Sequence, residues 1–322
     1  MKRFTDFCKR ALHRAGRMLH ALWRYTRGPL KYTYLGLMLL FLYLPIIYLI
    51  LFSFNQFHVD PNGDVIYKNL GKWNGFTLSN YGAIFGKFKG FSRANFKYGL
   101  FTNKAGNALI LTLEVAIISS IVATILGTAA AIGINSMKKR SRTAVLSVSQ
   151  LPMVNPDLVT GITFMMLFAF ASSLLGLKFS DFTRLLIAHI SFSVPYVIFS
   201  VLPRLKQSSD MLYEAALDLG CSPFKALWKA VIPDIMPGIT SGFIMALTMS
   251  LDDFVVSYFT ANTPVLSVFI YSNTQKGKIG VNPALATIIF IPLVAMLLAV
   301  NLRRLAKDRE YEIQNKKVKL KK

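Results

Sequence analysis

The stretch EAALDLGCSPFKALWKAVIP, residues 214–233, predicts two short helices joined by a tight turn. Asp210, just before it, can cap the first helix, and Gly220 supplies the left-handed residue that ends it. Pro223 is typical of the first turn of the second helix, where its missing N–H costs nothing, and Pro233 is expected to end that helix. The stretch is too short for an enzyme domain, so we interpret it as a surface hairpin.

One face of the second predicted helix is apolar. Four residues recur at the i, i+3, i+4, i+7 spacing of a helix face, namely Phe224, Leu227, Trp228 and Val231. Since an exposed aromatic stripe needs a partner to cover it, the pattern predicts a docking site for another protein. The alternative is an ordinary helix-turn-helix on the surface of a membrane protein.

The composition predicts an integral membrane protein. Of the 322 residues, 53% are hydrophobic, and the mean hydropathy of +0.46 is too high for an ordinary soluble domain. The net charge of +22 would suit nucleic-acid binding, but the basic residues gather in the termini and in short loops between apolar runs. This distribution indicates membrane topology, and no nucleic-acid partner is expected.

The sequence carries no motif for chemistry of its own. It has no phosphate-binding loop, nucleophile elbow or metal-ligand spacing. We therefore expect no catalytic residue, no metal and no cofactor in this chain. Cys8 and Cys221 both fall in segments that we place in the cytosol, so no disulfide is expected.

The N-terminal region divides into three predicted parts. Residues 1–31 carry nine Lys and Arg among apolar residues, which is typical of an amphipathic helix on anionic lipid; a signal or transit peptide is the alternative. Residues 32–54 form a first transmembrane helix, because at 1.5 Å per residue they can cross ~30 Å of hydrocarbon. Residues 55–104 form an extracytoplasmic loop, with a hairpin turn predicted at 61–64.

The core, residues 105–303, contains five further predicted spans. They are expected at 105–136, 145–175, 183–202, 235–260 and 284–302, with a cytoplasmic loop at 204–235 that holds the hairpin and a basic tail at 304–322. Alternating the sides puts 26 of the 37 Lys and Arg residues on one side and 11 on the other. The positive-inside rule then places both termini and the hairpin in the cytoplasm. The predicted fold class is an all-α integral membrane protein with six transmembrane helices.

Prolines interrupt two of these spans. Pro152 and the sequence Asn155-Pro156-Asp157 fall inside the span 145–175. Such residues are tolerated in a membrane helix where protein or a cavity satisfies the freed backbone groups. Pro195 is predicted to kink the span 183–202.

The span 235–260 carries two adjacent carboxylates, Asp252 and Asp253. Each costs about 2.5 to 3.5 kcal/mol near the bilayer centre, so both must face protein or water. At 100° per residue, Ser241, Thr248 and Asp252 share a polar side, which we interpret as a substrate pathway. The alternative is that both aspartates only hold helices together.

The other side of this span carries small residues four positions apart. They are Gly238, Gly242, Ala246 and Ser250. Such a ladder suits tight helix packing. Asp253 lies on this side, so we expect it to pair at a helix interface while Asp252 lines the path, and we include Asp253 among the pathway candidates in a supporting role.

Two other kinds of residue inside the spans are weighed in the same way. We interpret His189 as a hydrogen-bonded histidine between helices rather than a proton relay. Aromatic side chains such as Tyr258 can stack on a cationic ligand, which adds Tyr258 to the pathway candidates. Packing in the core or against lipid is the more common use of such rings.

The hairpin resembles the E-A-A-x3-G…L-P loop of the permeases of ABC importers. The matching residues are Glu214, Ala215, Ala216, Gly220 and Pro233. In that family the loop grips the ATPase subunit, so the resemblance implies a role in ATPase coupling. The residues expected to take part also include Pro223, Phe224 and Trp228. Ala230 and Ile232 stand where the pattern has Ile and Leu.

Several further stretches are similar to the second permease of spermidine/putrescine ABC importers. They are 153–157, 189–192 with Pro195, 250–256 and 282–287. The resemblance implies a type I ABC importer permease fold with cytoplasmic coupling helices, in a bacterial plasma membrane, and a polyamine as solute. As partners it implies a second permease, two cytosolic ABC ATPase copies and an extracytoplasmic polyamine-binding protein. The basic tails and the enlarged loop 55–104 depart from the family.

Three other functions remain as alternatives. One is an importer for another solute, since sugar, metal and opine systems share the docking loop. Another is a secondary transporter or channel with the polar span as its ion path, although no inverted repeat is visible. A non-transporting membrane scaffold is the third. Co-purification of an ATPase would separate the importers from the other two classes.

Overall fold

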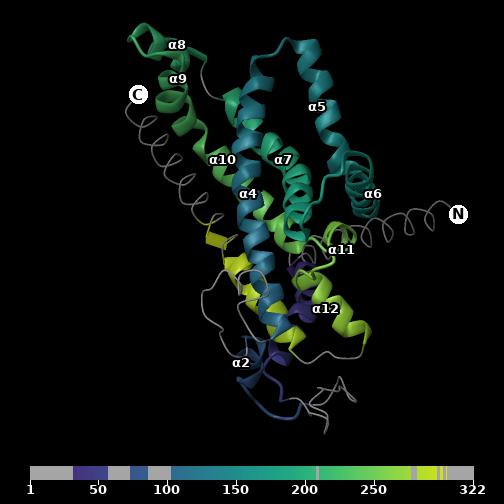
Figure 1. The fold of residues 1–322 in the computed structure, drawn as a ribbon. Helices are drawn as coiled ribbons and strands as arrows, with labels where there is room; N and C mark the ends of the chain where they lie inside the picture. The colour runs from purple at the N-terminus through teal and green to yellow at the C-terminus, as the bar shows by residue number, and fades with distance from the viewer. Residues whose placement is uncertain are drawn as a thin grey trace, which may run out of the picture.

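The computed structural model describes residues 32–56, 73–85, 103–207, 210–276, 281–295, 298–299 and 302. In this part of the chain the regular structure is helical, and the β pairing is one isolated antiparallel bridge between Asn55 and Phe76 (Figure 1). The prediction of an all-α membrane protein is confirmed. The expected N-terminal helix 1–31, the turn at 61–64 and the tail 304–322 lie outside the described residues.

The described helices follow one another with short connections. In chain order the labelled ones are α2 (Ser79–Phe85), α4 (Lys104–Ser136), α5 (Lys139–Val154), α6 (Asp157–Leu175), α7 (Asp181–Gln207), α8 (Asp210–Asp218), α9 (Pro223–Ala226), the π-helix η1 (Leu227–Val231), α10 (Ile232–Asp252), α11 (Val255–Thr260) and α12 (Leu266–Gln275). Two unlabelled helices, Tyr32–Phe52 and Asn282–Ala295, precede and follow them.

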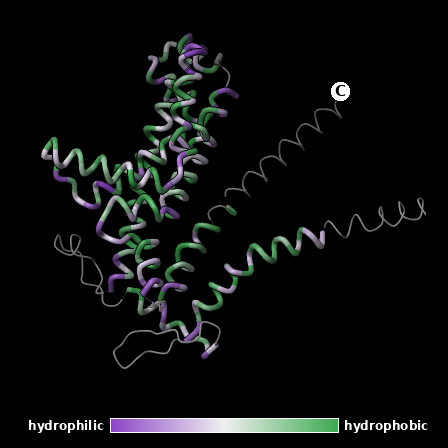
Figure 2. Tube along the Cα trace, turned by 90° about the vertical axis from the view of Figure 1, so that its right-hand side faces the viewer, coloured by the Kyte–Doolittle hydropathy of each residue, from purple (hydrophilic) through white to green (hydrophobic). Residues whose placement is uncertain are grey.

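Five helical segments in the described chain are long and apolar enough to cross a membrane. They are Tyr32–Phe52, Lys104–Ser136, Asp157–Leu175, Asp181–Gln207 and Pro223–Asp252. The sixth span, predicted at 284–302, corresponds to the shorter apolar helix Asn282–Ala295, beyond which only part of the chain is described. Hydrophobic residues prevail along these helices, and hydrophilic residues occur mostly in short stretches between and at the ends of the apolar runs (Figure 2).

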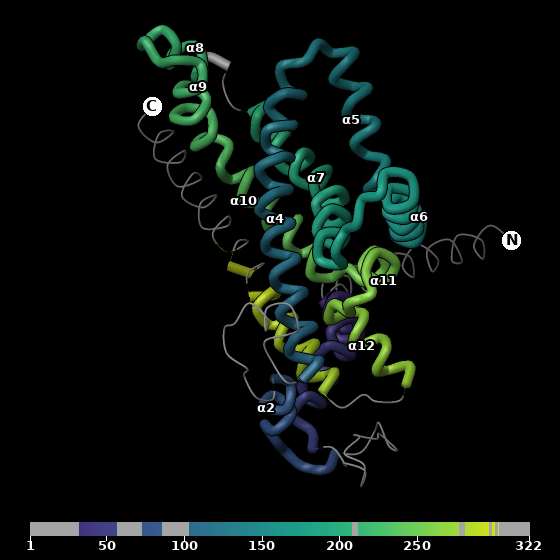
Figure 3. The backbone as a smooth tube through the Cα atoms, viewed as in Figure 1, coloured from purple at the N-terminus to yellow at the C-terminus, as the bar shows by residue number. Residues whose placement is uncertain are grey.

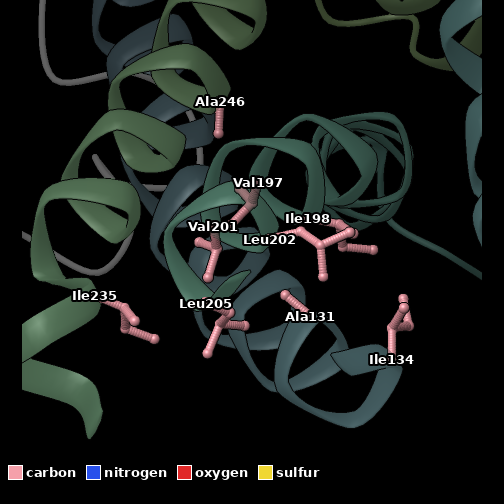
Figure 4. Packing of buried hydrophobic residues seen from close by; sticks show 9 residues of the cluster. All are labelled: Ala131, Ile134, Val197, Ile198, Val201, Leu202, Leu205, Ile235 and Ala246. Atoms are coloured by element: carbon pink, nitrogen blue, oxygen red, sulfur yellow. The ribbon is translucent and has the colours of Figure 1, made fainter. Parts of the chain in front are cut away.

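The centre of the fold is the packing of α7 against α4 and α10. Nine buried apolar residues from these three helices form the largest cluster (Figure 4): Ala131, Ile134, Val197, Ile198, Val201, Leu202, Leu205, Ile235 and Ala246. Val197 of α7 lies between a glycine of each neighbour, because a Cβ placed on Gly127 of α4 would come within 2.6 Å of it and one on Gly242 of α10 within 3.1 Å. Small residues therefore set how closely the three helices approach.

The small-residue ladder of α10 packs as predicted. Gly238, Gly242, Ala246 and Ser250 are all buried. Gly238 leaves room for the aliphatic part of Arg204 in α7, since an added Cβ would lie 2.8 Å from its Cγ. This face of α10 is thus a helix interface.

Helix breaks divide two of the predicted spans. The expected span 145–175 is two helices, α5 and α6, separated at Asn155-Pro156, where proline cannot continue the hydrogen-bond ladder. The prediction that residues 235–260 form one continuous helix is wrong, because α10 ends at Asp252 and a second helix, α11, begins at Val255. In contrast, α7 continues as a helix through Pro195. Figure 3 shows α5 and α6 as separate coils, with α11 below α6.

Pro233 does not end the second helix of the hairpin, so that prediction is also wrong. A proline lacks the N–H that would donate to the carbonyl four residues earlier. Here the wider turn Leu227–Val231 precedes it, in which the Ile232 N–H bonds to the carbonyl of Leu227. This turn shifts the hydrogen-bond register by one residue before the proline, so that helical structure runs on from Pro223 to Asp252.

The helices place the hairpin and the basic cluster at one end. Figure 1 shows α8, α9 and the start of α5 at the top, and α2 at the bottom. The four basic residues at 138–142 and the hairpin 214–233 therefore share one end of the molecule, as the charge-based topology requires.

We predict that Gly127→Ala lowers the thermal midpoint of the detergent-solubilised protein, whereas Gly133→Ala on the same helix does not. The added methyl group at Gly127 meets Val197 at 2.6 Å, while nothing lies within 4 Å of a Cβ at Gly133. Overpacking of this kind costs about 1–3 kcal/mol, and alanine in place of glycine in an open helix gains up to about 1 kcal/mol. Fluorescence-detected size-exclusion after heating measures both variants, and equal midpoints would contradict the packing described.

Candidate functional site

The turn of the hairpin is built on Gly220. Its φ of 82° lies in the left-handed region that glycine adopts without strain. The Gly220 N–H donates to the Leu217 carbonyl at 2.8 Å, and the Cys221 N–H donates to the Ala216 carbonyl at 3.1 Å. This pair of bonds is the Schellman ending of a helix, so the predicted role of Gly220 in ending α8 is confirmed. Because the side chain of Asp210 lies outside the description, its predicted cap is untested.

The tip of the hairpin presents an apolar surface to solvent. Phe224 is 73% exposed, Trp228 is 63% exposed, and their rings stack with centroids 6.2 Å apart. Leu219, across the turn, is 87% exposed. Four more of the predicted coupling residues are exposed, namely Glu214, Ala215, Pro223 and Pro233, and Ala216 is half-buried. We call Leu219, Phe224 and Trp228 the apolar tip.

The apolar tip is joined to the membrane part by one helical segment. Helical structure is continuous from Pro223 to Asp252, through α9, η1 and α10. At 1.5 Å per residue, these 30 residues span about 45 Å. A movement of the tip can therefore be carried to Asp252, at the other end of this segment.

The two aspartates at that end have different environments. Asp253 is nearly enclosed, with a side chain 8% exposed. Its Oδ1 accepts a hydrogen bond from the Val256 N–H at 3.2 Å, and its Oδ2 accepts from the Ser257 N–H at 2.8 Å and the Ser257 Oγ–H at 2.7 Å. The carboxylate thus satisfies the first N–H groups of α11 across the break. Asp253 therefore caps the start of α11, and its expected supporting role in the pathway stays a prediction.

Asp252 points elsewhere and is exposed. It lines a cavity of about 510 Å³ together with Thr248 and Ser267, and the remaining lining is apolar. The walls come from α10, α12 and both unlabelled helices, including Pro45 of the first and Phe290 of the last. Asp252 is the acidic side chain in this lining, so a cation entering the cavity would meet its carboxylate.

The other predicted pathway residues do not all join this cavity. Thr248 does, although its hydroxyl donates to the Ile244 carbonyl at 2.8 Å. Ser241 is half-buried, lies two turns closer to the hairpin than Thr248, and is not part of the lining. Tyr258 is 50% exposed on α11, within an aromatic group that includes Phe254 and Tyr271. The structure therefore brings together two of the predicted pathway residues, Thr248 and Asp252.

A second cavity, of about 490 Å³, opens at the break between α5 and α6. Asn155, Pro156 and Thr160 line it on one side, and Ser191 and Phe192 of α7 on the other. An interrupted helix beside a cavity is the setting in which a membrane tolerates free backbone groups.

His189 lies between the helices at the α10–α11 break. The ring is 2% exposed, with its Nδ1 2.6 Å from Ser250 Oγ and its Nε2 3.0 Å from Ser257 Oγ. Asp253 Oδ2 is 3.6 Å from Nε2. The prediction of a hydrogen-bonded histidine between helices is confirmed.

Sequence reasoning missed residues that this region uses. Ser119 of α4 lies 3.1 Å from Ser250 Oγ, and Ser257 joins His189 to Asp253. A serine in a transmembrane helix gives no sign of which helix it faces. Glu114, half-buried in α4, was also not singled out. Its signal was visible, since a carboxylate within an apolar run is costly in a membrane.

Among the described residues, no group of three or more His, Cys, Asp and Glu side chains is arranged to hold a metal ion. The acidic residues at the break are instead engaged with hydroxyls and backbone N–H groups, or open to the cavity. A carboxylate that opens on a cavity in a membrane helix can attract a cation.

Comparison with known proteins gives one matching family. Residues 123–309 match the family described as binding-protein-dependent transport system inner membrane component. The matched stretch begins within α4 and includes the hairpin, both breaks and the aspartate pair.

Curated relatives match most of the chain. It is 32% identical over 274 residues to the spermidine/putrescine transport system permease protein PotC of Escherichia coli K12, covering 84% of this chain and 90% of that protein. It is 29% identical over 297 residues to the putrescine transport system permease protein PotI of the same strain, covering 89% and 96%. A PotC homolog of Mycoplasma genitalium is 24% identical over 291 residues, covering 90% and 96%.

Solved structures share the fold. A chain of a bacterial ABC transporter involved in the import of the acidic polysaccharide alginate is similar with a TM-score of 0.59 and 17% identity, over 88% of this chain and 97% of that chain. A bacterial alginate ABC transporter in complex with an alginate pentasaccharide-bound periplasmic protein is similar with a TM-score of 0.57 and 18% identity, over 88% and 98%. At these identities the likeness shows the fold alone.

Proposed function

Because the chain belongs to the binding-protein-dependent transport system inner membrane component family, we propose that it is the permease subunit of an ATP-driven importer whose solute is a polyamine such as spermidine or putrescine. The chain is a multi-pass membrane protein with the fold of ABC importer permeases. The chain is similar over 84% of its length to PotC, which is described as a spermidine/putrescine permease, and over 89% to PotI, which is described as a putrescine permease.

The observation that carries the choice of solute is the open carboxylate of Asp252. The carboxylate oxygens of its neighbour Asp253 accept hydrogen bonds from the first N–H groups of α11, whereas Asp252 faces a cavity lined mostly by apolar groups. A polyamine is a multivalent cation, and a cation in a low-dielectric passage needs a counter-charge. A neutral sugar carries no charge for this carboxylate to balance.

The second part of the proposal concerns ATP. The sequence has no phosphate-binding loop, so ATP and Mg²⁺ are assigned to two copies of a cytosolic ATPase. The apolar tip suits a cleft on that ATPase, because removing exposed aromatic rings from water lowers the free energy of the complex. Closure of the ATPase would then move the helical segment from Pro223 to Asp252 as one body.

The remaining partners follow from the same family. A second permease completes the passage, and an extracytoplasmic binding protein delivers the polyamine. The membrane is the plasma membrane of a bacterium, with both termini and the hairpin in the cytosol and the loop 55–104 outside, because 26 of the 37 Lys and Arg residues then lie inside.

We predict that a cysteine introduced at Asn62 reacts with an impermeant thiol reagent added to intact cells, and that Cys221 reacts only after the cells are opened. Asn62 belongs to the proposed outer loop and Cys221 to the hairpin. Mass-tag labelling followed by gel electrophoresis reads both sites. Labelling of Cys221 in intact cells, with protection of the residue-62 cysteine, would invert the topology.

We predict that Gly220→Val leaves membrane insertion intact but separates ATP hydrolysis from uptake, while Gly220→Asn stays coupled. A φ of 82° costs a branched side chain about 1–2 kcal/mol, whereas asparagine tolerates it. An added Cβ meets nothing within 4 Å, so the effect comes from the backbone rather than from a clash. Uptake and ATPase activity are measured together in proteoliposomes; coupled transport by Gly220→Val would refute the role of this turn.

We predict that Asp252→Asn lowers polyamine uptake by about tenfold or more, equivalent to ~1.4 kcal/mol, with complex assembly and basal ATPase activity preserved. Asp252→Glu keeps the charge in the cavity and should retain most uptake. Radiolabelled putrescine and spermidine are assayed in complexes reconstituted with their binding protein. Normal uptake by Asp252→Asn would leave Asp252 without a role in the pathway, and uptake of another solute alone would refute the polyamine.

A further inference from the structure

We propose that His189 is a positioning residue that joins α10 to α11 across their break, so that Asp252 keeps its place at the cavity when the hairpin moves. The inference rests on the proposed import function and adds to it a device for transmitting movement. Nδ1 of the ring contacts Ser250 Oγ, near the end of α10, and Nε2 contacts Ser257 Oγ in α11. One side chain of α7 therefore ties both sides of the interruption to the same neighbour.

The hydrogen bonds have a common direction, which follows from the donors available. Ser257 donates its only hydroxyl proton to Asp253 at 2.7 Å, so toward His189 its oxygen can only accept, and Nε2 must carry a proton. In the neutral ring Nδ1 is then an acceptor for the Ser250 hydroxyl. Ser250 in turn is within 3.1 Å of Ser119 on α4. These contacts link Ser119 of α4, Ser250 of α10, His189 of α7 and Ser257 of α11 to the carboxylate of Asp253 at the break.

Asp253 makes this arrangement costly to open. The carboxylate is nearly enclosed, and its backbone carbonyl also accepts a hydrogen bond from Ser267 Oγ of α12 at 2.7 Å. If the two helices separated at the break, the Ser257 hydroxyl would leave His189 or Asp253, and a buried polar group would lose its partner. Such a loss costs about 1–3 kcal/mol, more for a charged group. The break therefore has a preferred geometry, although the backbone hydrogen bonds of the helix are interrupted there.

This geometry matters because of what lies on each side. On one side is the helical segment that begins at the apolar tip, and its last residue is Asp252. On the other side, α11 packs against α6, and Ser267 of α12 shares the cavity with Asp252. A displacement of α10 reaches α11 and the cavity only if the break does not bend. The imidazole supplies that stiffness.

The experiment compares His189→Leu with His189→Gln in complexes assembled with the second permease, the ATPase and the binding protein. Leucine fills the space but offers no hydrogen bond, whereas glutamine carries a donor and an acceptor on one planar group. Ser193→Ala is the matched control, because Ser193 is also buried in α7, one turn away, and its hydroxyl has no hydrogen-bond partner in the described chain. We expect His189→Leu to lower solute imported per ATP hydrolysed about tenfold, His189→Gln to recover most of it, and Ser193→Ala to match the wild type.

A second readout needs no solute and so separates this inference from the proposed function. Spin labels at Met245 of α10 and Tyr258 of α11, both exposed, report the distance across the break by pulsed electron resonance in a background without Cys8 and Cys221. With His189 the distance distribution should be narrow and unchanged when the ATPase is trapped closed. With His189→Leu it should broaden or shift between the two states.

The two readouts have distinct failures. If wild-type complexes import no polyamine but the spin-label distances behave as expected, the proposed solute is wrong and the role of His189 stands. If His189→Leu leaves both the distance distribution and the imported solute per ATP unchanged, His189 does not position the break. Equal losses in His189→Leu and Ser193→Ala would show general loosening of α7, which also overturns the inference.

Discussion

An ionised carboxylate inside a membrane helix must be matched by donors, and much of the centre of this protein is organised by that requirement at Asp253. Backbone N–H groups of α11 and the hydroxyl of Ser257 supply the match. These donors are available because α10 stops at Asp252, since an unbroken helix would use the same N–H groups for its own ladder. The break in the span and the buried carboxylate therefore depend on each other, and the imidazole of His189 in α7 lies 3.6 Å from the same carboxylate.

The division of labour between the adjacent aspartates follows from this match. In a regular helix, two neighbouring side chains differ in direction by about 100° and share one backbone environment. With the break between them, one carboxylate caps the new helix while the other remains at the end of the old one. Asp253 is thereby fixed by the fold, and Asp252 is free for the cavity. A pair of identical residues can in this way take one structural and one cavity-facing position.

The sequence predicts the helices, the glycine turn and the small face of α10 well, because each depends on local periodicity or on one residue's conformational range. Gly220 and the ladder from Gly238 to Ser250 illustrate this. It fails where a tertiary contact outweighs the local pattern. The break at Asp253 occurs within an apolar run without proline, and the partners that stabilise it, Ser119 and His189, come from other helices. At Pro233 the error had another origin, since a wide turn accommodates a proline that an ordinary helix would not.

The wide turn Leu227–Val231 has an evolutionary consequence. A π turn holds one residue more than a regular α-helical turn, so inserting a single residue into a regular helix at this position would produce it. Removing that residue would rotate everything before it by about 100° around the axis of α10. Phe224 and Trp228 would then face a different direction, while the residues packed against α7 stayed in place. An insertion at this position lets natural selection re-aim a contact surface in one step, without disturbing the membrane core that supports it.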